Sequence, residues 1–352
     1  MKIDHSFYNA ESAAHPPTSR DVATLAGVSQ STVCRVFDSK WSDRISPKTR
    51  ERVLTAAREL GYSPNAIARS LTANRSGIIG IVVSEDYNDF YYDLLRMITN
   101  ELQKLDMRVM LFNAAPYQEI QTVFQKMTEY RVDGVIVTAA AISNVAKPFY
   151  LERSVPMVLV NIYSTEPFCD SVITDNYNGS RDMARYLYRC GCRNFAYVSA
   201  GKSRYFDVPD RQRGFEDELA GKPDVTCQIC TGDYSYASGQ EIARELLAQA
   251  ERPDCVFCSG SRMAYGVMDV ARQEFGISVP EQLSVAAYDD MATSVLGSYQ
   301  LTAVQQDSAQ LARRSVELLL NNINGVGADE IENISVPTAL AIRGSVRSPE
   351  ET

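Results

Sequence analysis

The residues best suited to chemistry lie close together near the N-terminus. Gln30, Ser31, Thr32 and Arg35 bring amide, hydroxyl and guanidinium groups into six consecutive positions. Such groups form hydrogen bonds with the edges of bases and with phosphates. If this stretch is helical, the four side chains occupy its outward positions, and they indicate contact with nucleic acid.

The surrounding residues predict a helix-turn-helix. Ala23 stands where two helices would cross, and Gly27 stands in the turn between them. Two helices joined by a short turn approach closely only over a small residue and turn most easily over a residue with positive φ. We expect helices over about residues 19–26, 30–37 and 47–60. The apolar positions that would form their common core are Val22, Ala26, Val28, Val33, Val36, Val53, Leu54, Ala57 and Leu60. An ordinary three-helix bundle with a polar outer face is the alternative.

The charge distribution divides the chain. The net charge of −9 argues by itself against a nucleic-acid partner. Residues 18–76, however, hold ten basic and five acidic side chains, a balance of +5, whereas residues 77–352 balance to −13. A basic segment joined to an acidic body is expected when one part contacts phosphates and the other does something else.

From Ile78 onward, short apolar runs alternate with amphipathic helices at spacings of roughly 25 to 30 residues. This rhythm is typical of parallel α/β sheets. The runs form two series, so we expect two doubly wound sheets, hence two lobes with a cleft where strand carboxyl ends converge on a ligand. The expected strands are 78–83, 109–112, 134–137 and 156–160, then 195–198, 225–229, 255–258 and 283–287.

Three segments of the head resemble the lactose-repressor (LacI/GalR) family of transcriptional regulators. They are Thr18–Val36 (TSRDVATLAGVSQSTVCRV), Ser46–Val53 (SPKTRERV) and Gly61–Leu71 (GYSPNAIARSL). The resemblance runs to about Val346. It implies a tail (1–17), a helix-turn-helix domain (18–63), a hinge helix and linker (64–77), a two-lobed periplasmic-binding-protein-like core (78–346) and a second tail (347–352). The lobe crossovers are expected near residues 174 and 306 and along a final strand around 334–343.

The resemblance also implies how DNA is bound. A homodimer, with a tetramer as the alternative, would bind a pseudo-palindromic double-stranded operator through successive major grooves. Gln30, Ser31 and Arg35 match the family's base-reading positions, and Arg35 could bond a guanine bidentately. In the hinge helix, Leu71 would wedge into the minor groove beside Ala68, with Asn65 as a cap near phosphate. The full set of expected DNA-contacting residues is Thr18, Ser29, Gln30, Ser31, Thr32, Arg35, Asn65, Ala68 and Leu71.

Two departures from the family pattern lie in the head. Cys34 stands where the family usually has a hydroxyl, so only a weak donor is left for phosphate. The segment 38–44 is longer than the common loop and contains the only tryptophan, Trp41. Contacts in this segment therefore cannot be transferred from the family.

For the core, the resemblance implies a small-molecule effector, such as a sugar, sugar acid or sugar phosphate. The expected contacts are Phe90, Tyr91, Arg211, Tyr234 and Asp289. An Arg211–Asp289 ion pair across the cleft and packing of the aromatic rings in the core are the structural alternatives. Gly260 and Ser261 replace two polar residues of the family pattern, which weakens the case for a simple sugar. Arg262 would favour an anionic ligand if it turned inward, but outward exposure is the simpler expectation.

Catalysis is not expected. Both histidines, His5 and His15, lie in the leading tail, so the folded part lacks the commonest general base. We expect no cofactor and no metal. The two C-x-x-C pairs lie in predicted strands, where residues i and i+3 point to opposite faces, and buried free thiols are the simplest interpretation. A binding protein or enzyme on the same core, with a vestigial head, is the alternative function.

The N-terminus lacks the apolar segment of a secretory signal, and no apolar run approaches the roughly 18 residues of a membrane span. We therefore expect a cytoplasmic protein with no membrane partner.

Overall fold

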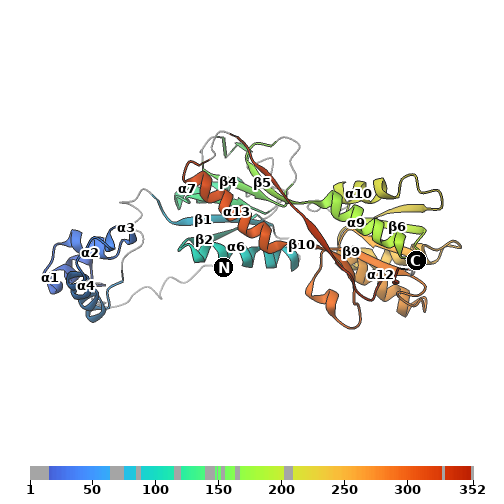
Figure 1. Cartoon of the computed structure of the whole chain (residues 1–352), viewed down its shortest axis with the longest axis horizontal. Coiled ribbons are helices and arrows are strands. Elements are labelled where there is room, and N and C mark those ends of the chain that lie inside the picture. Colours follow the sequence, from blue (N-terminus) through green and yellow to red (C-terminus); the bar gives the residue numbers. More distant parts are fainter. Residues whose placement is uncertain are drawn as a thin grey trace, which may run out of the picture. The chain divides into compact units, whose positions relative to one another are not determined.

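The computed structural model divides into two compact units, Met1–Ser76 and Gly77–Thr352 (Figure 1). The hinge-helix residues Asn65, Ala68 and Leu71 lie outside the part of the chain that the structure describes. That part comprises residues 16–63, 75–84, 89–114, 120–138, 147–148, 150–151, 155–162, 167–201, 209–326 and 330–349.

The first unit, called the head below, has three helices where they were expected and one short helix that was not. They are α1 (Ser19–Ala26), α2 (Gln30–Val36), α3 (Ser39–Ser42) and α4 (Pro47–Leu60). Gly27 ends α1 with φ of 61°. Arg52 of α4 donates to the carbonyls of Ala26 and Gly27, so α4 also fixes the turn between α1 and α2. A cationic group at a helix C-terminus is favourable because the carbonyls there carry partial negative charge.

The core of the head follows the predicted pattern with two differences. Its buried residues are Val22, Ala23, Ala26, Val33, Val36, Val53, Ala56 and Ala57. Val28 and Leu54 are only half-buried, and Leu60 is exposed at the last residue of α4. The small side chains of Ala56 and Ala57 face α1 and α2, which keeps the helices close.

The second unit contains two six-stranded sheets. The N-terminal lobe has the strand order β11-β5-β4-β3-β1-β2, all in parallel pairs. Helices α6 (Asp89–Lys104) and α13 (Ser308–Ile323) pack on one face, and α7 (Ile120–Glu129) packs on the other. The strands are β1 (Ile78–Ser84), β2 (Arg108–Ala114), β3 (Gly134–Val137), β4 (Met157–Val160), β5 (Asp170–Thr174) and β11 (Asn333–Val336).

The C-terminal lobe repeats this arrangement with the order β12-β10-β9-β8-β6-β7. Helices α9 (Asn176–Arg189) and α10 (Pro209–Leu219) cover one face, and α11 (Tyr236–Leu247) and α12 (Ser261–Gln273) cover the other (Figure 1). The strands are β6 (Asn194–Ser199), β7 (Thr226–Thr231), β8 (Cys255–Cys258), β9 (Ser284–Tyr288), β10 (Thr302–Gln306) and β12 (Thr338–Ala341). A short 3-10 helix, η3 (Ala292–Val295), follows β9. The predicted two-sheet α/β architecture is confirmed.

The chain passes between the lobes three times. It leaves β5 at Thr174 for α9, and it leaves β10 at Gln306 for α13. The third passage corrects the expectation of one final strand over 334–343. Pro337 separates β11, in the first sheet, from β12, in the second, where β12 pairs antiparallel to β10. Proline has no N–H for a sheet ladder, so it suits the position between two strands.

Strand β5 was not expected from the sequence, because it begins with polar residues. Asp170 is nevertheless buried, and it accepts hydrogen bonds from the Asn322 side chain and from the Glu332 backbone N–H. These partners are remote in sequence, so no local pattern reveals them. None of the described helices is long and apolar enough to cross a membrane.

Helices α11 and α12 approach so closely that Gly239 has no room for a side chain. A Cβ there would lie 2.2 Å from the carbonyl oxygen of Met263 and 2.7 Å from its Cα. We expect Gly239→Ala to destabilise the protein by about 2 kcal/mol, because backbone must move to relieve the overlap. The measurement is the thermal unfolding midpoint. Gly297→Ala is the control, because its Cβ would meet nothing within 4 Å and should change stability by less than about 0.5 kcal/mol. Equal midpoints for the two variants would contradict this packing.

Candidate nucleic-acid interface and ligand cleft

The N-termini of α1 and α2 carry capping networks built from the predicted contact residues. The Thr18 backbone and hydroxyl both donate to Asp21 Oδ2, at 2.8 and 2.7 Å. These bonds lower the pKa of the Asp21 carboxyl. The Ser29 hydroxyl accepts from the Thr32 N–H at 3.2 Å. Both caps fix helix ends whose remaining N–H groups can face an anion.

The outward side of α2 is polar and exposed, as predicted. Gln30, Ser31 and Arg35 are exposed, and Thr32 is half-buried. Gln30 Nε2 donates to Ser19 Oγ at 2.9 Å, so an α1 side chain orients this amide. The Ser29 hydroxyl also lies 2.8 Å from that of Ser31. The structure therefore places Thr18, Ser29, Gln30, Ser31, Thr32 and Arg35 on the first two helices of the head.

Trp41 is a neighbour of Arg35 that sequence reasoning did not identify. The Arg35 guanidinium carbon lies 5.8 Å from the centroid of the Trp41 ring, and that of Arg44 lies 4.8 Å from it. The sequence offered one signal, a single aromatic residue, Trp41, between Arg35 and Arg44 in a segment that is longer than the usual loop. Only the short helix α3 shows that both arginines reach the same ring.

In the C-terminal lobe, Arg211 of α10 is the centre of the predicted ligand site. Its side chain is almost completely buried, and its guanidinium carbon lies 3.7 Å from the centroid of the Tyr288 ring. Nε donates to Asn176 at 2.8 Å, and Nη1 donates to the Tyr234 hydroxyl at 2.6 Å and to the Ser259 carbonyl at 2.8 Å. Burial by itself lowers the pKa of Arg211, but Tyr234 and Asp289 nearby raise it above the ordinary value.

Asp289 follows β9 and is the counter-ion of Arg211. Arg211 Nη2 lies 3.4 Å from Asp289 Oδ1, which also accepts from Gln306 Nε2. Both charged residues belong to the C-terminal lobe, so the ion pair does not cross the cleft as the structural alternative supposed. Asp289 and Tyr234 have left-handed backbones, with φ of 71° and 73°. Such conformations in non-glycine residues are concentrated at functional sites.

Gln306 connects this pair to the lobe crossovers. Its Oε1 accepts from the Thr174 hydroxyl at 2.6 Å and from Asn161 Nδ2 at 2.8 Å. Asn161 Oδ1 in turn accepts from the Thr174 N–H at 2.9 Å. Sequence reasoning missed Asn161, Asn176, Ser259 and Gln306 as members of the site. Each is polar and stands at or just beyond a strand end, and that was the available signal.

Of the two predicted aromatic contacts in the N-terminal lobe, one packs into the core. Phe90 is 4% exposed and belongs to the hydrophobic cluster between α6 and the sheet. Tyr91 is half-buried and meets Phe90 edge to face, with ring centroids 5.2 Å apart. Burial raises the pKa of Tyr91 to about 12, while Arg211 acts to lower it and Asp289 to raise it. Tyr91 therefore lies in the electrostatic neighbourhood of the ion pair.

The departure at Gly260 has a steric explanation. A Cβ on Gly260 would lie 2.3 Å from the Tyr234 ring, so that ring occupies the space of a side chain. Arg262 is exposed, and its Nη2 lies 3.8 Å from Oδ1 of Asp89 in the facing lobe. The Ser259 hydroxyl oxygen is buried and has no hydrogen-bond partner among the residues that the structure describes.

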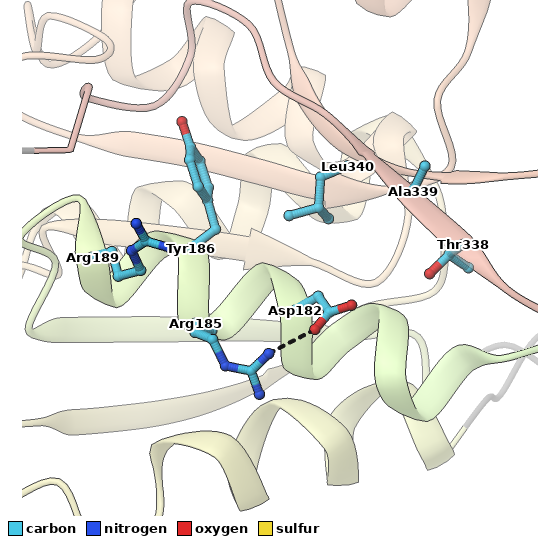
Figure 2. A pocket seen from close by; sticks show the side chains of 7 residues that line it. All are labelled: Asp182, Arg185, Tyr186, Arg189, Thr338, Ala339 and Leu340. Carbon is cyan, nitrogen blue, oxygen red and sulfur yellow. Dashed lines mark hydrogen bonds and ion pairs between the residues drawn. The ribbon is translucent and has the colours of Figure 1, made fainter.

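Two hollows lie in the second unit. Of the residues predicted to bind a ligand, only Phe90 lines either of them. Figure 2 shows a cavity of about 310 Å³ between α9 and β12, where Arg185 pairs with Asp182 at 2.9 Å. A second, of about 560 Å³, lies where the lobes join, and Phe90, Asp290 and Gln306 are among its lining residues. Neither is lined by Arg211 or Asp289.

The cysteines are all free thiols, but not all are buried. Cys34 and Cys227 are exposed and Cys230 is half-buried, which corrects the expectation of buried thiols for these three. Cys255 and Cys258 pack on opposite faces of the second sheet, as the strand argument required. The described residues contain no group of three or more potential ligands for a metal ion.

The Arg211–Asp289 pair yields a stability prediction. We expect Asp289→Ala to destabilise the protein by about 3 kcal/mol or more, because it leaves a buried guanidinium without its counter-ion. Asp182→Ala is the control, since its partner Arg185 is largely exposed and such pairs contribute about 0 to 1 kcal/mol. Denaturant unfolding measures both changes. A loss for Asp289→Ala no greater than that of the control would show that the charge needs no partner.

Comparison with known proteins agrees with these features. Residues 18–65 match the model of bacterial regulatory proteins of the lacI family, and residues 184–346 match that of a periplasmic binding protein-like domain. The HTH-type transcriptional repressor PurR of Erwinia tasmaniensis is 30% identical over 334 residues, which cover 94% of this chain and 96% of PurR.

Two solved structures are similar over nearly the whole chain. A lac repressor dimer bound to operator and the anti-inducer ONPF has a TM-score of 0.80 at 26% identity, and the match covers 95% of this chain and all of that one. A complex of the transcriptional regulator CelR with cellobiose has a TM-score of 0.69 at 28% identity, covering 94% and 99%. Together with the near-complete match to PurR, these similarities show that the chain belongs to the lacI family of bacterial regulatory proteins.

Proposed function

We propose that this protein is a transcriptional repressor that binds a pseudo-palindromic operator as a homodimer and responds to a small-molecule effector in the inter-lobe cleft. The observation that carries the proposal is the exposed polar surface of α2 within residues 18–76, whose charge balance is +5, joined to residues 77–352, whose balance is −13. Such a protein would act in the cytoplasm, at the nucleoid.

The proposed DNA contacts divide by chemistry. Gln30, Ser31 and Arg35 read base edges in the major groove, since their donors and acceptors are exposed on α2. Thr18, Ser29 and Thr32 lie at helix N-termini, where backbone N–H groups favour phosphate. The second set fixes the orientation of α2 and the first supplies sequence preference.

The hinge residues complete the proposed interface. Asn65, Ala68 and Leu71 would form a helix too short to be stable alone, which would fold when two copies meet over DNA. Leu71 would then enter the minor groove, and the cost of unstacking a base step would be offset by the contacts that a kinked duplex permits.

The proposed effector is derived from a carbohydrate: a sugar, sugar acid or sugar phosphate. Arg211 and Asp289 offer a donor fork and an acceptor at the carboxyl ends of the strands. Tyr234 and Tyr91 supply aromatic surface, and the buried Ser259 hydroxyl, which has no partner among the described residues, offers a further polar group. Phe90 supports Tyr91 from the core.

Gln306 explains how effector binding could reach the head. It contacts both Asp289 and Thr174, and Thr174 stands at one of the three crossovers. A ligand that prefers one lobe arrangement shifts the population of the protein toward it. The spacing of the two heads in a dimer, and with it operator affinity, would follow.

The alternative, a binding protein or enzyme with a vestigial head, has less support. The caps, the glycine turn and the core of the head are all intact. PurR is named as a transcriptional repressor and CelR as a transcriptional regulator.

DNA binding is tested by selecting duplexes from a randomised library with the full chain and measuring affinities at fixed salt. We expect Arg35→Ala to weaken binding to the selected duplex by about 5- to 150-fold, the equivalent of losing one base-specific contact, and to relax the preference at one base pair. Arg96→Ala, a change at an exposed position on α6 of the second unit, is the control. A chain starting at Gly77 should select nothing. The proposal fails if the full chain also selects nothing.

Effector binding is tested by a thermal-shift screen over sugars, sugar acids, sugar phosphates and purines. A true effector at about 100 times its Kd should add about 2.7 kcal/mol to the free energy of unfolding. Arg211→Lys should abolish the shift, because an ammonium cannot reproduce the planar fork that meets four acceptors. Arg213→Lys, two residues along the same helix and exposed, should retain it. A shift that survives in Arg211→Lys would place the ligand elsewhere.

A further inference from the structure

We propose that Trp41 is a specificity-determining residue that positions Arg35 for base reading, and that Arg44, held by the same ring, is an additional phosphate contact. The inference rests on the proposed function, because it assumes that α2 meets DNA. It concerns the segment 38–44, to which neither the family resemblance nor the relatives assign a role.

The geometry brings two cations to one aromatic ring. Arg35 and Arg44 lie 5.8 and 4.8 Å from the Trp41 centroid, within the range of cation–π attraction. Within the described part of the chain, neither arginine forms an ion pair. Two like charges therefore lie close to one ring, and neither is in salt-bridge contact with a carboxylate among the described residues. A phosphate or the acceptor edge of a guanine would supply the missing negative charge.

The segment that carries Trp41 is anchored at both ends. The Asp38 carbonyl accepts from the Trp41 and Ser42 N–H groups at 3.0 and 2.8 Å, and the Trp41 carbonyl accepts from Arg44 N–H at 3.0 Å. Ser42 is buried, and Ile45 packs on the core of the head. The indole ring thus has a defined place relative to α2.

Trp41 is not a core residue of the head. Its exposed fraction is 37%, and it belongs neither to the buried cluster nor to the half-buried residues around that cluster. Its ring lies instead beside the guanidinium groups of Arg35 and Arg44. Ordering a flexible arginine before binding reduces the entropy lost on binding.

Arg44 also answers the departure at Cys34. A thiol is a weak donor for phosphate, and Cys34 is exposed on α2. Arg44 offers a stronger, charged donor next to the same helix. The longer segment 38–44 would thus restore a contact to a DNA phosphate that Cys34 weakens.

The experiment uses the full chain and the duplex that the wild-type chain selects from a random library. Affinity and single-base preferences are measured for Trp41→Ala, Arg35→Ala and the double variant. We expect Trp41→Ala to weaken binding about tenfold and to relax preference at the same base pair as Arg35→Ala. The double variant should lose no more than Arg35→Ala alone, because the two residues act as one unit. Trp41→Phe should restore part of the preference.

Arg44→Ala should behave differently. We expect it to weaken binding to selected and unselected duplexes alike and to reduce the slope of log affinity against log salt by about 1. Arg96→Ala should leave the slope unchanged. An unchanged slope in Arg44→Ala would overturn the phosphate role.

Two further results keep the test decisive if Trp41→Ala folds poorly. Trp41 is the only tryptophan, so its fluorescence in the wild-type chain reports this site alone. We expect the selected duplex to quench or shift that emission, and an unchanged emission overturns the inference. If the wild type is selective and Trp41→Ala retains the preference at that base pair, the inference is overturned but the proposed function stands. A wild-type chain that selects no sequence overturns the proposed function, and the inference with it.

Discussion

The burial of one guanidinium organises the C-terminal lobe. Arg211 of α10 reaches Asn176 at the start of α9, Ser259 after β8, Tyr234 after β7 and Asp289 after β9. A buried charge is tolerable only if its donors are satisfied and a counter-ion is near. Because each partner comes from a different element, the Arg211 side chain links four segments at the carboxyl edge of this sheet.

That constraint extends to the joint between the lobes. Asp289 also bonds Gln306, which bonds Thr174 and Asn161, and these residues lie where the chain leaves the two sheets. A ligand that competes for Arg211 or Asp289 would disturb contacts at the crossovers. The proposed ligand site and the lobe joint thus share one hydrogen-bonded network, the physical basis needed for coupling.

The head is held together by the packing of small apolar side chains and not by a buried charge. Its core is made of valines and alanines, which let three short helices pack closely. Its polar residues are divided between caps, such as Thr18 and Ser29, and the exposed surface of α2. Trp41 belongs to neither group, and its two arginine contacts make it the most informative side chain of the longer segment.

The sequence by itself determined the elements whose causes are local. Caps, turn glycines and apolar periodicity predicted α1, α2, α4 and the strands from β1 to β9 except β5, because these signals act within a few residues. Only the tertiary structure decided which polar groups meet. It placed both charges of the Arg211–Asp289 pair in one lobe, buried Phe90, and split the final strand between two sheets at Pro337. Contacts of this kind join residues that are far apart in the sequence; Asn161 and Gln306, for example, are 145 positions apart. Such contacts leave no trace in local spacing.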